Sequence, residues 1–501
     1  MSELDPGIFK AYDIRGLYGS QIDGDIAELI GRAFARVLAR LVDKPVSELR
    51  LGLGHDMRLS APELAARYRA GLLAEGTHVI DAGLIGTEML YFLVGSRELD
   101  GGLMCTASHN PKAYTGVKLV RDGAIALSED TGIQDIRRLI EAGLDRAGEG
   151  ENDTTSGDGA AEPSGGDRVE TVDLYGEFQA HVARFINAAA VRSVSPRPLR
   201  VVLDGGNGMA GPMVGPLLED LGLDLIETCW TPDGNFPEHE PNPLLPENRR
   251  VIIERVRQSD ADLGIAWDGD GDRCFFIDDT GAFVDGDFLT ALLAEWLLRR
   301  GQGQHPAHWA GSEGAEFAAG SPASGSGEAI LYDVRASWAV PDTVRNAGGI
   351  PYINRVGHAF FKTRMRAEGS LFGGEVSGHY YFRDFYCADS GTIPALLILE
   401  LLSTRRKRMS ELLAPYHAKY FISGEINSEV RDPDAKIEEI AAHFSDATQS
   451  RLDGISIDYD DWHFNVRPSN TEPLLRLCLE SLVSPEDMVR RRDEVLALIR
   501  S

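Results

Sequence analysis

The sequence predicts a mixed α/β protein in which three similar α/β units are followed by a smaller α+β domain. Three times a short apolar run leads into a polar turn and then a helix-like stretch, at residues 51–56, 201–206 and 330–333. The stretch after about residue 418 differs, because strand-like runs there surround two helices. A chain of 501 residues is also too long for one hydrophobic core. Several domains are therefore expected.

The clearest helix signal follows the first apolar run. Ser60 is placed as the N-cap and Pro62 lies in the first turn. Apolar residues then recur at helical spacing, at Leu64, Tyr68 and Leu72. Alternation of such helices with apolar runs predicts parallel or mixed sheets, with ligand-binding loops at the ends of the strands.

Changes in composition mark the expected domain boundaries. Residues 147–167 are rich in Gly, Ser, Asp, Glu and Thr and contain no large apolar side chain, so they are expected to end the first domain. Residues 301–327, rich in Gly, Ser and Ala, predict a surface loop inside the third unit. The predicted domains are residues 1–168, 169–282, 283–417 and 418–501.

The C-terminal domain is predicted to be small and to have its own core. Strand-like runs occur at residues 422–430, 462–466 and 474–479. The last helix is expected to start at Ser484-Pro485-Glu486-Asp487, a sequence with an N-cap serine, an early proline and acidic residues in the first turn.

Charge and cysteine usage limit the possible partners and compartment. Fifty Lys and Arg residues against 78 Asp and Glu residues give a net charge of −28, which argues against nucleic acid or an anionic membrane as the main partner. The five cysteines are scattered without C-x-x-C spacing, which favours reduced thiols over a disulfide framework or a zinc site. Because no signal peptide or long apolar segment is found, a cytoplasmic location is expected.

The most informative segment is Asp268-Gly269-Asp270-Gly271-Asp272-Arg273, which follows the apolar run 263–267. Three carboxylates converge only where a cation offsets their repulsion. The spacing is similar to a calcium EF-hand loop, but Arg273 replaces the glycine at the sixth position and Asp279 the glutamate at the twelfth. Three carboxylates with open positions suit Mg²⁺, which also takes phosphate oxygens. The alternative is a solvated acidic turn.

A second segment, Thr106-Ala107-Ser108-His109-Asn110-Pro111, follows the apolar run 103–105. This order places Ser108 on a tight turn at a strand end, where a serine is exposed and able to act as a nucleophile. Lys118 lies just beyond the turn. The alternative is a serine that only bonds its own backbone. A hydrolase elbow is excluded because G-x-S-x-G is absent.

Two later loops carry groups that bind phosphates or sugars. The loop 467–473, Arg-Pro-Ser-Asn-Thr-Glu-Pro, offers a guanidinium, two hydroxyls and an amide, which suit a phosphate; a rigid turn is the alternative. The loop 374–379, Gly-Glu-Val-Ser-Gly-His, offers groups that hydrogen-bond sugar hydroxyls; a β-turn with a structural histidine is equally compatible.

In these four segments and their order, the chain resembles the α-D-phosphohexomutase superfamily, in its phosphomannomutase (phosphomannomutase/phosphoglucomutase) branch. The resemblance covers essentially the whole length and includes residues 9–16, 233–237 and 355–360. It implies three topologically similar mixed α/β domains and a smaller C-terminal α+β domain around a central cleft. The phosphoserine, metal, sugar and phosphate loops would belong to the four domains in that order.

The resemblance also implies roles for individual residues. Ser108 would carry a phosphoryl group, and Mg²⁺ would be held by Asp268, Asp270, Asp272 and a phosphate oxygen on Ser108. The residues expected in catalysis are Arg15, Ser108, His109, Lys118 and Arg273. The residues expected to bind the sugar are Arg335, His358, Glu375, Ser377 and His379, and those expected to bind the second phosphate are Arg467, Ser469, Asn470 and Thr471.

The implied activity is that of a phosphomannomutase, an isomerase that interconverts mannose 6-phosphate and mannose 1-phosphate. A hexose 1,6-bisphosphate would be both the intermediate and the activator. The alternatives are a dual phosphomannomutase/phosphoglucomutase, a mainly glucose-specific enzyme, a non-catalytic sugar-phosphate-binding paralogue and a sugar phosphatase. The expected partners are small hexose phosphates, and the expected assembly is a monomer or homodimer.

Overall fold

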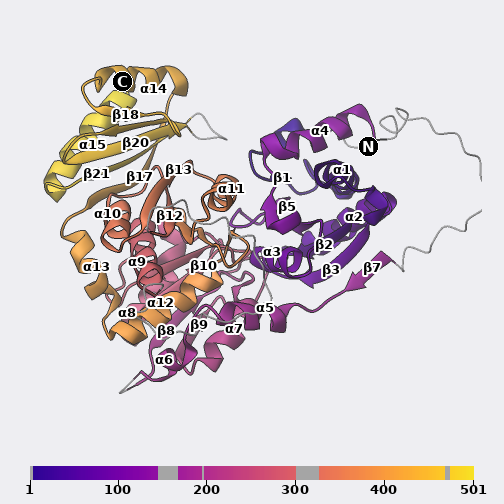
Figure 1. Ribbon diagram of the computed structural model, residues 1–501, viewed down its shortest axis with the longest axis horizontal. Coiled ribbons are helices and arrows are strands. Elements are labelled where there is room, and N and C mark those ends of the chain that lie inside the picture. Colours follow the sequence, from indigo (N-terminus) through magenta and orange to yellow (C-terminus); the bar gives the residue numbers. More distant parts are fainter. Residues whose placement is uncertain (1–3, 145–167, 195–196, 301–326, 469–473) are drawn as a thin grey trace, which may run out of the picture. The chain divides into compact units, whose positions relative to one another are not determined.

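The computed structural model describes residues 4–144, 168–194, 197–300, 327–468 and 474–501, which form two compact units (Figure 1). The first unit comprises Met1–Phe276 with Ala388–Leu396, and the second comprises Ile277–Cys387 with Leu397–Ser501. The predicted end of the first domain and all but Gly327 of the predicted surface loop lie outside the described residues.

The first sheet of the first unit runs in the order β1-β5-β4-β2-β3-β7, with the short β6 paired to β5. Strands β4, β2, β3 and β7 are parallel to one another, whereas β5 runs antiparallel to both β4 and β1. The strands of this sheet are β1 (Ile14–Leu17), β2 (Arg50–His55), β3 (His78–Leu84), β4 (Gly101–Cys105), β5 (Tyr114–Arg121), β6 (Ile125–Ala126) and β7 (Val169–Thr171). Its helices are α1 (Gly24–Val42), α2 (Ala61–Ala74), α3 (Thr87–Ser96) and α4 (Ile133–Ala142).

Helices α1 and α2 approach each other closely through two glycines. A Cβ on Gly31 of α1 would lie 2.4 Å from the carbonyl oxygen of Tyr68, and one on Gly71 of α2 would lie 2.2 Å from that of Glu28. The helix predicted from the sequence is α2, and its predicted apolar residues are buried. Ser60 does precede this helix, but its side chain makes no capping hydrogen bond because its backbone is already helical.

The second sheet has the order β11-β10-β8-β9, in which β10, β8 and β9 are parallel. Parallel pairing brings the carboxyl ends of β8 and β10 to the same edge, where the metal loop begins. The strands are β8 (Arg200–Asp204), β9 (Asp224–Thr228), β10 (Leu263–Trp267) and β11 (Cys274–Ile277). The helices are α5 (Tyr175–Ala183), α6 (Ala188–Arg192), α7 (Ala210–Asp220) and α8 (Arg250–Ser259). The first unit also contains β16 (Ala388–Asp389), which is not a strand of this sheet.

The second unit contains a mixed sheet and an antiparallel sheet. In the mixed sheet, β13, β12 and β14 are parallel and β15 is antiparallel to β14. Its strands are β12 (Ala329–Asp333), β13 (Ile350–Asn354), β14 (Phe372–Gly374) and β15 (Tyr380–Phe382). The helices are α9 (Gly286–Arg299), α10 (Ala339–Asn346), α11 (His358–Glu368), α13 (Met409–His417) and the part of α12 (Thr392–Arg405) from Leu397 onward.

The C-terminal sheet is antiparallel, in the order β17-β21-β20-β19-β18. The three predicted strands and the last helix are confirmed, and Ser484 accepts a hydrogen bond from the backbone N–H of Asp487 as its N-cap. The prediction missed β18, whose residues Thr448–Ser450 are polar and exposed and so have no apolar alternation, and the short β19. The elements are β17 (Phe421–Glu429), α14 (Pro433–His443), β18 (Thr448–Ser450), β19 (Ile455–Asp458), β20 (Trp462–Pro468), β21 (Leu474–Ser481) and α15 (Pro485–Ile499).

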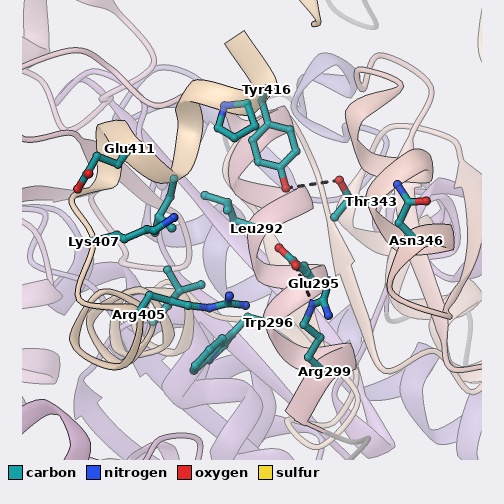
Figure 2. A pocket seen from close by; sticks show the side chains of 13 residues that line it. Leu292, Glu295, Trp296, Arg299, Thr343, Asn346, Arg405, Lys407, Glu411 and Tyr416 are labelled. Atoms are coloured by element: carbon teal, nitrogen blue, oxygen red, sulfur yellow. Dashed lines mark hydrogen bonds and ion pairs between the residues drawn. The ribbon is translucent and has the colours of Figure 1, made fainter. Parts of the chain in front are cut away.

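Three α/β sheets with parallel strands and an antiparallel C-terminal domain confirm the predicted fold class. None of the described helices has the length and apolar character needed to cross a bilayer. A pocket of about 350 Å³ in the second unit is lined by α9, α12, α13 and residues of α10 (Figure 2). Tyr416 and Thr343 meet across it, and it contains none of the residues predicted for the site.

Candidate active site

Ser108 lies in the loop that follows β4, and the buried side chain of Arg58 holds the backbone of this serine loop. Arg58 is 2% exposed, and its Nη2 donates to the carbonyl oxygen of Ser108 at 2.7 Å. The same guanidinium also donates to the carbonyl oxygens of Asn110, Pro111 and Tyr114. Asp56 lies 3.4 Å from Arg58 Nε and accepts a hydrogen bond from Thr106, whose hydroxyl accepts one from Ser108 N–H. This support fixes the loop in place.

The prediction that Ser108 is exposed is wrong, because its side chain is covered by the metal loop. Ser108 is only 4% exposed, and its backbone has a left-handed conformation with φ of 49°. Such a conformation is uncommon for a residue with a Cβ and persists where the surroundings fix it. A Cβ on Gly269 would lie 2.6 Å from the carbonyl oxygen of Ser108. A glycine at 269 therefore permits the two loops to meet.

The three aspartates of the metal loop converge in the interior rather than in solvent, which excludes a solvated acidic turn. Asp268 and Asp270 are 0% exposed and Asp272 is 1% exposed. One carboxylate oxygen from each lies within 4.8 Å of those of the other two. Ser108 Oγ donates to Asp268 Oδ2 at 2.8 Å, so the serine hydroxyl belongs to the same cluster.

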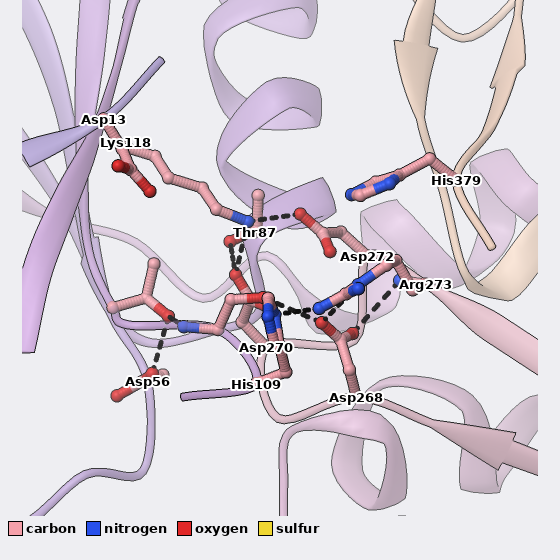
Figure 3. A network of polar contacts seen from close by, with 12 residues as sticks. Asp13, Asp56, Thr87, His109, Lys118, Asp268, Asp270, Asp272, Arg273 and His379 are labelled. Atoms are coloured by element: carbon pink, nitrogen blue, oxygen red, sulfur yellow. Dashed lines mark hydrogen bonds and ion pairs between the residues drawn. The ribbon is translucent and has the colours of Figure 1, made fainter. Parts of the chain in front are cut away.

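Basic and hydroxyl side chains surround this cluster (Figure 3). Lys118, on β5, donates to Asp270 Oδ2 at 2.7 Å and also to Asp272. Arg273 donates through Nε to Asp268 Oδ2 at 3.0 Å. Thr87, the first residue of α3, donates to Asp270, and its role was not predicted from the sequence because it lies 183 positions away.

The remaining catalytic candidates of the first unit lie around the serine loop. His109 places Nδ1 3.3 Å from Ser108 Oγ and is also in contact with the guanidinium of Arg273. Arg15, on β1, donates to the side-chain oxygen of Asn110 at 2.7 Å and pairs with Asp13. The structure thus brings together seven of the eight predicted catalytic and metal residues through direct contacts, and Arg15 joins them through Asn110.

Burial and mutual repulsion shift the acidity of these groups. Burial raises the pKa of Asp268 well above its usual value, and burial together with Asp270 raises the pKa of Asp272 to about 7. For Asp270, burial is outweighed by the Lys118 ammonium, which holds its pKa below the usual value. Burial alone would lower the pKa of Lys118, but the aspartates raise it, so the ammonium stays charged.

The donor set fits a hard divalent cation. Oδ1 of Asp270 is buried and has no hydrogen-bond partner among the described residues. An unpaired carboxylate oxygen in the interior is costly unless a cation contacts it. Oxygen donors at this spacing are the ligands that Mg²⁺ prefers. The three aspartates therefore have the chemistry of a magnesium site.

The predicted sugar-binding residues lie together in the second unit. Glu375 and His379 are the ends of a tight turn between β14 and β15, in which Glu375 N–H donates to the carbonyl oxygen of His379 at 2.9 Å. Ser377 Oγ lies 3.4 Å from His379 Nδ1, and the His358 and His379 rings are 6.2 Å apart. Arg335 Nη2 lies 3.8 Å from Glu375 Oε2.

Glu375 is held by partners that sequence reasoning missed. It accepts hydrogen bonds from Gly357 N–H at 3.0 Å and from the Tyr381 hydroxyl. Burial raises the pKa of Glu375 to about 7. Arg335 also reaches Glu425 on β17 at 3.2 Å, so the C-terminal sheet is joined to this group. These contacts fix the orientation of the sugar loop.

Only part of the predicted phosphate loop is described. Arg467, on β20, is 8% exposed, and its Nε has no partner among the described residues. Ser469, Asn470 and Thr471 lie outside the described residues. A buried guanidinium nitrogen without a partner is suited to an anionic ligand.

Comparison with known proteins covers all four parts of the chain. Residues 6–146, 177–281, 285–420 and 425–498 match the domains described as phosphoglucomutase/phosphomannomutase alpha/beta/alpha domains I, II and III and the C-terminal domain.

Relatives that match the chain over nearly its whole length belong to the same family as these domain matches. The chain is 40% identical over 494 residues to "Phosphohexose mutases" of Xanthomonas campestris pv. campestris (strain ATCC 33913), covering 98% of this chain and 99% of the relative. It is 41% identical over 498 residues to "Phosphomannomutase" of Escherichia coli (strain K12), covering 98% of each. A crystal structure of a phosphoglucomutase/phosphomannomutase family protein from Burkholderia thailandensis has a TM-score of 0.81 at 30% identity, covering 99% of this chain and 98% of that one. The chain therefore belongs to the phosphoglucomutase/phosphomannomutase family and is a phosphohexose mutase, an isomerase.

Proposed function

We propose that this phosphohexose mutase interconverts mannose 6-phosphate and mannose 1-phosphate, with Ser108 as the residue that carries the phosphoryl group. The observation that supports this most is the 2.8 Å hydrogen bond from Ser108 Oγ to Asp268 inside the buried aspartate cluster. A serine oxygen in that position lies next to a cation site and to the charged Lys118, which suits phosphoryl transfer.

Magnesium is the cation that the donor set favours, held by Asp268, Asp270, Asp272 and a phosphate oxygen on Ser108. When bound, it would neutralise charge on the transferring phosphoryl group. A phosphate on Ser108 would supply one more oxygen ligand, so magnesium should bind more tightly to the phosphorylated protein. Equal magnesium affinity in the phosphorylated and dephosphorylated forms, measured by titration calorimetry, would contradict the shared ligand.

Each half-reaction exchanges one P–O bond for another. The phosphoryl group leaves Ser108 Oγ for a sugar hydroxyl oxygen, and the hydroxyl proton is taken up nearby; the second half-reaction returns the opposite phosphate to Ser108 Oγ. Lys118 and Arg273 are placed to stabilise the negative charge near Ser108, because both already contact the aspartates of the cluster. His109, with Nδ1 3.3 Å from Ser108 Oγ, is the nearest imidazole available for proton handling. Arg15 would help to position the substrate through its contact with the serine loop.

Recognition of the sugar is assigned to the group in the second unit. Glu375, Ser377 and His379 offer a carboxylate, a hydroxyl and an imidazole to sugar hydroxyls, with Arg335 and His358 beside them. Arg467, Ser469, Asn470 and Thr471 would hold the phosphate that is not being transferred. Mannose is placed first because full-length relatives carry the name phosphomannomutase.

Two measurements test the proposal. The kcat/KM for mannose 1-phosphate should exceed that for glucose 1-phosphate, and a ratio near one would mean dual specificity instead. Ser108→Ala should abolish turnover while hexose phosphate binding remains. The matched control is Ser60→Ala, because Ser60 makes no capping hydrogen bond. Wild-type turnover by Ser108→Ala would exclude the phosphoserine, and steady release of inorganic phosphate would indicate a phosphatase.

A further inference from the structure

A second group of potential metal ligands lies in the first unit, in the α/β domain of β8–β11. Asp204 is the last residue of β8, and Cys229 follows the last residue of the neighbouring parallel strand β9. His239 comes from the long connection after β9. One oxygen, one sulfur and one nitrogen from these residues all lie within 4.8 Å of one another.

The spacing of the three atoms fits a tetrahedral metal centre. Cys229 Sγ lies 3.6 Å from His239 Nε2, and Asp204 Oδ2 lies 3.1 Å from the same nitrogen. Around a tetrahedral zinc ion with usual bond lengths, sulfur and nitrogen ligands are about 3.6 Å apart and nitrogen and oxygen ligands about 3.4 Å apart. These two observed distances lie within a few tenths of an ångström of that geometry.

The orientation of the His239 imidazole also fits a metal ligand. His239 Nδ1 lies 2.9 Å from the carbonyl oxygen of Glu240, which only accepts hydrogen bonds, so Nδ1 carries a proton. Metal-ligating histidines usually donate their other ring N–H to such an oxygen. Asp204 is oriented in turn, since its Oδ1 accepts the N–H of Gly206 at 3.0 Å. Both Nε2 and Asp204 Oδ2 are thereby directed at the cluster.

A cysteine nucleophile does not fit this arrangement. In a Cys-His-Asp triad, the thiol and the carboxylate engage opposite nitrogens of the imidazole. Here both approach Nε2, which has room for a single proton or a single metal bond. Without a metal ion, a protonated Nε2–H would donate to Asp204 Oδ2 as an ion pair, whereas a cation shared by the three atoms accounts for the approach of Cys229 as well.

Charge and ligand type identify the class of ion. A thiolate, a carboxylate and a neutral imidazole carry two negative charges, which a divalent cation neutralises. His239 and Asp204 are only 8% and 2% exposed, so that neutralisation takes place in a poorly solvated environment. Sulfur and imidazole ligands favour zinc over magnesium. We propose that Asp204, Cys229 and His239 bind a zinc-class divalent cation, separately from the three aspartates.

The cation would brace the connection that supports the serine loop. Between Cys229 and His239, a Cβ on Gly234 would lie 2.6 Å from the carbonyl oxygen of Met57, and the Phe236 ring lies 5.4 Å from the Arg58 guanidinium. Arg58 in turn holds the carbonyl oxygen of Ser108. The proposed cation would therefore tie β8 and β9 to this connection, which packs against the segment that supports the loop of Ser108.

The experiment is Co²⁺ substitution of the full chain after treatment with a chelator and dialysis. Wild type should bind Co²⁺ with a thiolate-to-cobalt charge-transfer band, which the all-oxygen aspartate cluster does not produce, and Zn²⁺ should displace it and raise the melting temperature. Cys229→Ser and His239→Gln should each remove the band and weaken Zn²⁺ binding by at least about tenfold. Circular dichroism checks that each variant is folded.

Two controls separate this site from the proposed function. Cys387→Ser removes another partly buried thiol and should keep the band. Asp270→Asn should keep the band although it disrupts the magnesium cluster. The proposal is overturned if wild type shows no thiolate band, if the band persists in folded Cys229→Ser, or if Asp270→Asn loses it.

Discussion

The two candidate metal clusters of the first unit differ in how their ligands are brought together. Asp268, Asp270 and Asp272 come from one loop and offer only oxygen, whereas Asp204, Cys229 and His239 come from two strand ends and a long connection and offer oxygen, sulfur and nitrogen. The first cluster contacts Ser108 directly, whereas the second is linked to it indirectly, through Phe236 and Arg58 among other contacts. In our proposals, the first would serve chemistry on a phosphoryl group and the second would hold the scaffold.

The comparison teaches that similar proximity of ligand atoms does not imply a similar role. Hard oxygen donors beside a hydroxyl suit a cation that also binds phosphate. A thiolate and an imidazole with a fixed tautomer suit a cation that remains bound during turnover. The predictions below test this separation.

The largest expected effect is that of Asp270→Asn. Loss of one carboxylate from the oxygen cluster should lower kcat by about a thousandfold, equivalent to about 4 kcal/mol, because charge stabilisation at the reacting group is lost. The measurement is the rate of mutase turnover over a range of Mg²⁺ concentrations. Asp220→Asn, at an exposed aspartate at the end of α7, should retain the wild-type rate. A loss of less than tenfold in Asp270→Asn would argue against the cluster as the catalytic metal site.

Arg58→Met tests how far the loop of Ser108 depends on the Arg58 side chain, which lies between the two clusters. It removes four hydrogen bonds to carbonyl oxygens and leaves the buried Asp56 without its basic partner, so the free energy of unfolding should fall by about 3 kcal/mol. Denaturant unfolding measures this loss. Arg58→Lys keeps the positive charge but not the several N–H donors of the guanidinium, so its stability should lie between those of wild type and Arg58→Met. Wild-type stability in Arg58→Met would show that the loop does not depend on this side chain.

A pair of glycine substitutions sharpens the comparison further. A Cβ on Gly269 would meet the carbonyl oxygen of Ser108 at 2.6 Å, and one on Gly205 would meet that of Cys229 at 2.9 Å. Gly269→Ala should lower kcat about tenfold because it displaces the serine loop, whereas Gly205→Ala should weaken Zn²⁺ binding more than it lowers kcat. Gly176→Ala, with no atom within 4 Å of the added Cβ, is the control. Equal effects of Gly269→Ala and Gly205→Ala on kcat would mean that the two clusters are not functionally separate.

The last test concerns a buried carboxyl that belongs to neither cluster. Burial raises the pKa of Asp287 to about 8, while its Oδ1 accepts the N–H of Ser337 at 2.7 Å. A carboxyl whose pKa is raised on folding stabilises the folded protein at low pH, and this contribution is lost as the pH rises through about 8. Asp287→Asn keeps the acceptor oxygen but cannot titrate. Between pH 5 and 8, the free energy of unfolding should therefore fall less steeply in the variant than in wild type, by up to about 1.4 kcal/mol per pH unit. Identical pH profiles of unfolding in wild type and variant would contradict the raised pKa.

Sequence reasoning went furthest where the ligands lie close together in the chain. The alternating aspartates and the apolar run before them were enough to predict three converging carboxylates after a strand, and the structure shows that convergence directly after β10. The same reasoning considered cysteine spacing alone and so favoured five ordinary thiols. The grouping of Cys229 with Asp204 and His239 depends on the pairing of β8 with β9, which local spacing does not encode.

The loop that carries Ser108 also shows that local sequence patterns do not predict contacts between distant segments. Its turn was predicted from Pro111 and the preceding apolar run, but the burial of Ser108 was not, since the covering residues lie 160 positions away. Arg58 and Thr87 had no signal of their own, because an arginine near a strand end and a threonine at a helix start are common. Their roles depend on contacts between distant segments, such as the sheet order that places β2 beside β4 and β4 beside β5.

By itself, the sequence determined the fold class, the order of the four loops and the oxygen chemistry of the aspartate cluster, because these follow from local periodicity and from residues close in the chain. Only the tertiary structure decided that the aspartates are buried against Ser108, that Arg58 supports the serine loop and that a sulfur, a nitrogen and an oxygen meet beside β8. The physical reason is that burial and long-range contact are set by strand pairing and loop docking, which link residues far apart in the chain.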